Sequence, residues 1–153
     1  MTRIGEVLLP GQVNLALEGT DKNDCVLRVL DLLRGDSRVK NFDALVATVM
    51  ERSAPAIEEN GCGICIAHGR TQGVNALVMA AGRLTEGIVT SETSSPIRLI
   101  FVAGIPAAFN SEYLRAIGAI ARICCDKERL DGLLAATTPA EFISLLSLGE
   151  KKL

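Results

Sequence analysis

The stretch GCGICIAHGRTQG, residues 61–73, encloses a short apolar run between glycines and carries the only histidine of the chain, His68. The run GICIA is too short for a core helix, and its bounding glycines are typical of a strand buried in a sheet. Residues 75–81 (NALVMAA) and 97–104 (IRLIFVAG) have the same character. We therefore predict three buried strands, with His68 at the end of the first.

Helical periodicity precedes and follows these strands. Apolar residues recur at spacings of three and four in residues 20–35, 41–54, 111–125, 130–134 and 138–149. The predicted N-caps are Thr20, Asn41, Ser111 and Thr138, and the predicted stops are Gly35, Pro55 and Gly149. A weakly alternating stretch, residues 13–19, adds one more strand. This order predicts one sheet flanked by helices, of class α/β or α+β, in a single domain that spans residues 1–153.

Composition excludes several classes of partner. The chain has a net charge of −2, 3% aromatic residues and no Trp, so it offers neither a basic field nor stacking platforms for nucleic acid. No apolar segment reaches the roughly 18 residues that a membrane span needs, and we expect no direct membrane insertion. The apolar stretch near the start, residues 7–9, is too short for a signal peptide. Five cysteines, an odd number, favour free thiols in the cytoplasm.

His68 is the first candidate for chemistry, because a neutral imidazole can attack phosphorus or act as a base near neutral pH. Gly69 brings an unobstructed backbone N–H beside the ring, and Arg70 adds a guanidinium that suits phosphate oxygens. Two structural alternatives stay open at this point. His68 could simply hydrogen-bond at a strand end, and Arg70 could be a solvated loop residue.

Cys62, Cys65 and His68 follow a C-x-x-C-x-x-H spacing, which raises the alternative of a metal knuckle with Cys124 or Cys125 as fourth ligand. The residues between them read as a strand, and in a strand Cys65 and His68 point to opposite faces. A redox C-x-x-C normally opens a helix, which this one does not. We therefore expect no metal, and we interpret both cysteines as small buried hydrophobes.

The segment GCGICIAHGR resembles the active-site segment of the enzyme IIA domains of the bacterial phosphoenolpyruvate-dependent sugar phosphotransferase system, of the fructose, mannitol and nitrogen-related type. Its matching residues are Gly61, Gly63, Ile64, Ile66, His68 and Gly69. The family also has an arginine nine positions before the first of these glycines, where this chain has Arg52. The resemblance extends over nearly the whole chain and includes the pair Asp21-Lys22 at the start of a helix. It implies a mixed sheet flanked by helices on both faces.

The resemblance also implies a function. His68 would accept a phosphoryl group from an HPr-like phosphocarrier protein and pass it to a IIB domain or to a regulatory target, without a cofactor. Arg52 would stabilise the phosphorylated state, aided by Gly69, Arg70 or Tyr113. A regulatory protein-binding module of the same fold, with weak or lost phosphotransfer, is the alternative.

Four positions depart from the family pattern and motivate that alternative. Ala67 replaces the proline before the histidine, Ser53 replaces the glutamate after the arginine, and Glu58 replaces a threonine. Tyr113 stands where many members have a second histidine, and its hydroxyl can still donate a hydrogen bond to phosphate. If Glu58 lay near His68, its charge would disfavour phosphorylation.

Overall fold

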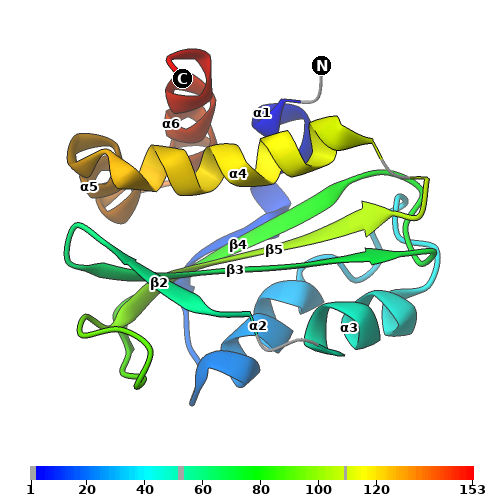
Figure 1. Cartoon of the computed structure of the whole chain (residues 1–153), viewed down its shortest axis with the longest axis horizontal. Coiled ribbons are helices and arrows are strands. Elements are labelled where there is room, and N and C mark those ends of the chain that lie inside the picture. The colour runs from blue at the N-terminus through cyan, green and yellow to red at the C-terminus, as the bar shows by residue number, and fades with distance from the viewer. Residues whose placement is uncertain (1–2, 52–53, 109) are drawn as a thin grey trace.

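The computed structural model describes residues 3–51, 54–108 and 110–153, and in this part of the chain helices cover both faces of a five-stranded sheet (Figure 1). The elements, in chain order, are α1 (Ile4–Val7), a short 3₁₀ helix (Pro10–Gln12), β1 (Val13–Leu17), α2 (Lys22–Asp31), α3 (Phe42–Glu51), β2 (Ala56–Glu59), β3 (Cys62–Thr71), β4 (Val78–Ile88), β5 (Ile97–Pro106), α4 (Ser111–Cys125), α5 (Lys127–Ala135) and α6 (Pro139–Lys151). No helix in the described ranges has both the length and the apolar composition to cross a bilayer.

The sheet is mixed, with strand order β1-β4-β5-β3-β2. β1 pairs with β4 and β3 pairs with β5 in parallel, whereas β4 with β5 and β2 with β3 are antiparallel. β5 is the central strand, and its side chains Leu99, Ile100 and Val102 are fully buried. A strand covered on both faces reads as a continuous apolar run, which is why residues 97–104 were recognisable in the sequence. The predicted mixed sheet is confirmed.

Two separate hydrophobic cores lie on the two faces of this sheet. Alternate residues of β5 divide between them: Phe101 and Ala103 join the core beneath α1, α4, α5 and α6, whereas Ile100 and Val102 join the core above α2 and α3. Figure 1 shows these two helical layers on opposite sides of the strands. Phe101 stacks on Phe142 of α6 with ring centroids 6.2 Å apart, which anchors the last helix. Helices on both faces, as predicted, are therefore confirmed.

The helix starts are close to their predictions, with small corrections at the caps. Asn41 and Thr138 accept hydrogen bonds from the backbone N–H groups of Ala44 and Glu141, as N-caps do. For α2 the cap is Asp21 rather than Thr20, and for α4 it is Asn110 rather than Ser111. Each correction moves the cap by one residue, to a side chain that is equally able to accept the bond.

The prediction that Gly149 ends the last helix is wrong. α6 continues to Lys151, and a Cβ at Gly149 would lie 3.0 Å from Cγ1 of Ile123 in α4. The glycine therefore permits close packing of α6 on α4, and this tertiary contact overrides the usual helix-stop meaning of glycine. Three elements were not predicted at all. They are α1, the 3₁₀ helix and β2, which are too short to show a periodic pattern.

A polar cluster joins the start of the chain to the link between α2 and α3. Arg38 forms a two-pronged ion pair with Asp36, with Nε–Oδ1 and Nη2–Oδ2 distances of 3.0 and 2.8 Å. Its Nη1 donates to the Val7 carbonyl at 2.9 Å, and Gln12 donates to the Asp36 carboxylate. The Asp36 side chain is only 8% exposed. These bonds hold the pKa of Asp36 at about 2, below its ordinary 3.8, chiefly through the Arg38 side chain.

This pKa predicts an acid-sensitive contribution to stability. A depressed carboxylate pKa stabilises the fold above the unfolded-state value and ceases to do so as pH falls toward the folded-state value. Asp36→Asn should therefore lose roughly 2 kcal/mol of unfolding free energy at neutral pH, and the gap to the wild type should narrow between about pH 5 and pH 2. Urea unfolding at several pH values measures this. A gap that stayed constant with pH would contradict the assignment, and Asp31→Asn, which removes an exposed ion pair, is the control.

Candidate functional site

The second half of β3 is an open edge of the sheet. β2 pairs only with the first residues of β3, from Cys62 to Cys65, so beyond Cys65 β3 has β5 on one side and no described strand on the other. His68 lies on this open half, opposite Ala103 of β5, and its side chain is exposed. Because β2 begins only at Ala56, opposite Cys65, no described strand pairs with β3 beside the exposed His68.

Strand alternation places His68 on the α4 side of the sheet. Ile66 packs against the core beneath α4, whereas Cys65 and Ala67 belong to the core above α2 and α3. His68 and Arg70 share the face of Ile66. Gly69, between them, faces α3.

Gly69 allows α3 to come into direct contact with β3. A Cβ at this position would lie 2.8 Å from Cγ2 of Thr48 and 3.2 Å from the Thr48 carbonyl oxygen. The missing side chain thus fixes how closely the end of α3 approaches His68. Gly69 was predicted for its backbone N–H, and this packing constraint is a second reason for glycine at the position.

A cavity of about 400 Å³ opens beside His68. It lies between the end of α3, the open half of β3, the end of β5 and the first turn of α4. Its lining residues are Thr48, Glu51, His68, Gly69, Arg70, Ile105 and Leu114. Three of the predicted site residues, His68, Gly69 and Arg70, are thus brought together at one opening.

The sequence reasoning missed the other four lining residues. Thr48 and Glu51 are three residues apart on α3, so they share a helix face. This spacing was the only feature of the sequence that could have indicated that they line one cavity together. Glu51 adds a negative charge to the cavity, and Leu114 adds an apolar side chain that is 45% exposed.

A larger opening, about 860 Å³, lies elsewhere, between β1, α2 and α3. Most of its charged side chains already pair with one another, as Asp24 does with Arg28 and Asp31 with Arg34. None of its lining residues is a histidine or a cysteine. Size alone therefore does not identify the site, and the cavity beside His68 is the better candidate for chemistry.

Arg70 is not a loosely solvated residue. It lies within β3, and its Nε donates to the Ala107 carbonyl at 3.0 Å, with a second bond from Nη2 to the same oxygen. These bonds tie the end of β3 to the segment between β5 and α4, so the guanidinium is held at the cavity.

Arg52 and Ser53 lie outside the described residues, so the predicted arginine is not located here. The described chain reaches Glu51 and resumes at Ala54, whose carbonyl accepts a 2.6 Å hydrogen bond from Lys22 Nζ. The same ammonium pairs with Glu92, whose other oxygen accepts from the Ala56 N–H at 2.8 Å. Lys22 and Glu92 therefore hold residues 54–56 against α2 and the loop between β4 and β5.

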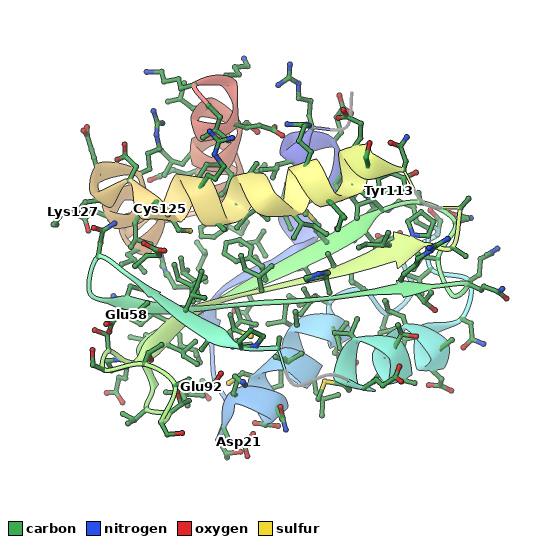
Figure 2. The ribbon with its side chains drawn as sticks, viewed as in Figure 1. Asp21, Glu58, Glu92, Tyr113, Cys125 and Lys127 are labelled. Atoms are coloured by element: carbon green, nitrogen blue, oxygen red, sulfur yellow. The ribbon has the colours of Figure 1, made fainter. Side chains whose placement is uncertain are left out.

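Tyr113 lies in the first turn of α4, near the end of β5 (Figure 2). Its side chain is half-buried and packs against the core beneath α4. The next residue, Leu114, lines the cavity instead, because consecutive helix residues point about 100° apart. The structure thus does not group Tyr113 with His68, and its predicted contact with phosphate stays a prediction.

Glu58 lies far from the cavity. It pairs with Gly63, five residues before His68 on β3, which corresponds to roughly 16 Å along a strand. It accepts hydrogen bonds from Ser94 Oγ and the Ser95 N–H at 2.8 and 2.6 Å, and these lower its pKa. Glu58 and Tyr113 appear at opposite ends of the sheet in Figure 2. The condition under which Glu58 would disfavour phosphorylation, a position near His68, is therefore not met.

The cysteines do not form a metal site. Cys62 belongs to the core beneath α4 and Cys65 to the core above α2, so the two thiols face opposite sides of the sheet. Burial raises the pKa of Cys65 to about 11, which keeps it a neutral thiol. Among the described residues no group of three potential ligands from His, Cys, Asp and Glu comes together.

Comparison with known proteins identifies the family. Residues 6–148 match the family described as "Phosphoenolpyruvate-dependent sugar phosphotransferase system, EIIA 2". The chain belongs to this EIIA 2 family. The match covers all strands and most of every helix except α1, so the resemblance inferred from the sequence is confirmed.

Two curated relatives agree with this EIIA 2 assignment. The fructose-specific EIIA component of Haloferax volcanii is 30% identical over 116 residues, which cover 75% of each chain. The fructose-specific EIIABC component of Bacillus subtilis is 22% identical over 150 residues, or 97% of this chain, which spans only 24% of that longer protein.

Solved structures share the fold. The nitrogen regulatory protein IIA-Ntr of Neisseria meningitidis has a TM-score of 0.76 at 22% identity, covering 94% of this chain and 98% of that one. Mannitol IIA of Escherichia coli has a TM-score of 0.70 at 19% identity, covering 89% and 96%. At these identities the likeness establishes the EIIA 2 architecture and nothing beyond it.

The contact between Gly69 and Thr48 gives a prediction on how the EIIA 2 cavity is built. Gly69→Ala should cost about 1–3 kcal/mol of unfolding free energy, because the added methyl displaces α3 from β3. Thr48→Ser removes the methyl that the new Cβ would strike, so the double variant should recover part of the loss. Chemical denaturation of the four proteins measures this coupling.

Gly11→Ala is the matched control, since a Cβ there meets nothing within 4 Å. A double variant that was no more stable than Gly69→Ala would show that the Thr48 methyl is not the obstacle.

Proposed function

We propose that this chain is the cytoplasmic phosphocarrier, or IIA, component of a phosphoenolpyruvate-dependent phosphotransferase system. In this proposal residues 1–153 act as a single IIA domain, His68 accepts a phosphoryl group from an HPr-like protein, and a IIB domain or a regulatory target receives it. The observation that carries the proposal is the exposed His68 at the open edge of β3, in a chain of the EIIA 2 family.

The proposed reaction exchanges one N–P bond for another. The lone pair of a neutral ring nitrogen of His68 attacks the phosphorus of the donor's phosphohistidine in line. The donor's N–P bond breaks, and its electron pair returns to the donor imidazole, while the ring protons equilibrate with solvent. Because the new bond is equivalent to the old one, the group stays reactive for the next transfer, and no cofactor is required.

Cationic partners are needed at this cavity, because the phosphoryl group would sit near the Glu51 carboxylate. We assign the stabilising role to Arg52, the residue that follows Glu51 in the sequence. Arg70, at the same cavity, and the backbone N–H of Gly69 are the further candidates. Tyr113 is a weaker candidate, since its side chain packs against the core.

The proposed acceptor is a IIB domain. The mannitol IIA of Escherichia coli, whose complex with phosphorylated mannitol IIB has been solved, has a TM-score of 0.69 at 16% identity and covers 92% of this chain and 98% of that one. The exposed Leu114 at the rim of the cavity gives a partner an apolar contact next to His68. The same surface would serve a regulatory target protein.

Phosphotransfer from phosphoenolpyruvate tests the proposal. With cognate enzyme I and HPr, the wild type should be labelled at one site by an acid-labile phosphoryl group, and His68→Ala should not be labelled. Cys125→Ser, which removes the exposed thiol, should be labelled like the wild type.

Equal labelling of His68→Ala and the wild type would refute His68 as the acceptor. A wild type that no cognate donor labels, but that still binds its partner, would instead identify the regulatory module.

The assigned role of Arg52 gives a separate prediction. Arg52→Ala should slow phosphotransfer to His68 by about 10²-fold, the usual effect of removing one preorganised charge partner, with little change in the thermal unfolding midpoint. Rapid-quench kinetics of transfer from phosphorylated HPr measures the rate. Arg28→Ala, in the exposed pair on α2, is the matched control. A rate within twofold of the wild type would exclude Arg52 from the site.

A further inference from the structure

Another cavity, of about 460 Å³, is lined by residues from both ends of the described chain and from α4. Figure 1 shows α1, α4 and the end of α6 in the same layer, on one side of the sheet. The lining of the cavity comes from the residue before α1, from α4 and from the end of α6. The lining residues are Arg3, Arg115, Gly118, Ala119, Arg122, Glu150, Lys151 and Leu153. None of them lines the cavity beside His68.

Positive charge is concentrated at this cavity although the chain as a whole has a net charge of −2. Its four cations come from three separate parts of the chain. Arg115 and Arg122 stand seven residues apart on α4, so they share one helix face. For Arg3, Arg122 and Lys151, no ion pair with another described residue is found. These side chains are available to an outside anion.

Glu150 lines the cavity and is buried, with only 2% of its side chain exposed. Its Oε1 accepts a 3.0 Å hydrogen bond from the Ile4 N–H, and its Oε2 faces Arg115 Nη2 at 3.4 Å. Arg115 also donates to Glu112 at 2.9 Å. These contacts join α1, α4 and α6 and orient the guanidinium of Arg115. At the cavity, the cations still outnumber the carboxylates.

Gly118 is a further feature, besides the cluster of cations, that points to a ligand. It lies in the middle of α4, one turn from Arg115 and one turn from Arg122, and a Cβ there would meet nothing within 4 Å. Packing therefore does not require glycine, and glycine weakens a helix relative to alanine. The missing side chain leaves α4's backbone open as the floor between two arginines.

We propose that this cavity binds a small phosphate-bearing metabolite. Guanidinium groups bind phosphate oxygens through paired hydrogen bonds, and arginines supply three of the four cations. The volume lies in the range of small-molecule sites and exceeds what one inorganic phosphate fills. Because the cavity has walls from three parts of the chain, it suits a small ligand better than the flat acidic surface of a macromolecule. The proposal does not depend on phosphotransfer by His68.

Pyrophosphate is the probe for this site, titrated into the full chain at constant ionic strength and followed by amide NMR shifts. Saturable shifts should concentrate on residues 115–122 and Lys151. Arg122→Ala should weaken binding at least tenfold, whereas Arg28→Ala, a control on the other face of the sheet, should bind like the wild type.

Gly118→Leu places a side chain over the floor of the cavity, and the Cβ of that side chain meets nothing within 4 Å. The variant should abolish pyrophosphate binding without lowering the thermal unfolding midpoint, because leucine favours a helix more than glycine does. This variant separates loss of the site from loss of the fold.

The proposal is overturned if shifts cluster around His68, if Arg122→Ala and Gly118→Leu bind like the wild type, or if no saturable binding occurs. Binding to vesicles of anionic lipid or to an acidic peptide, with none to pyrophosphate, would also overturn it.

Discussion

The parallel pairing of β3 with β5 is the interaction on which the rest of the candidate site depends. It holds His68 beside the most deeply buried strand of the sheet, while β2 stops short and leaves the other edge of β3 open. A reactive side chain gains two properties from this arrangement. Its backbone belongs to the central sheet, and its ring is exposed at a cavity that α3, β5 and α4 help to line.

Two further constraints define the wall that α3 contributes to the cavity. Gly69 sets how near α3 lies to β3, because any side chain there would strike Thr48. Lys22 and Glu92 hold the chain at Ala54 and at Ala56, the first residue of β2. One constraint is steric and the other is electrostatic, and they act on either side of the position of Arg52 in the sequence. The geometry around His68 thus depends on residues from four elements that are distant in the chain.

Most of the fold could be predicted from the sequence because its long elements are locally consistent. β5 shows a continuous apolar run, and the helices carry caps such as Asn41 and Thr138 next to apolar periodicity. The missed elements are those that tertiary contacts decide. β2 exists because its four residues pair with β3, and α6 passes Gly149 because Ile123 packs against it.

The candidate site was predictable only in part, and for the same reason. His68, Gly69 and Arg70 are consecutive in the sequence, so a local motif can mark them. Thr48, Glu51 and Leu114 reach the cavity from α3 and α4, and no local pattern shows which helix face turns toward β3. Glu58 shows the opposite error, since only the register of β2 on β3 reveals how far it lies from His68.

Helix α4 contributes consecutive residues to two different openings, Leu114 to the one beside the imidazole and Arg115 to the cationic one. A packed helix moves as a rigid rod, so any rotation about its axis would displace both side chains at once. A ligand that binds in one opening and favours one orientation of α4 would then change the affinity of the other opening for its own ligand. By thermodynamic linkage, the second ligand would change the affinity for the first by the same factor. Communication between the two openings would need no element besides α4.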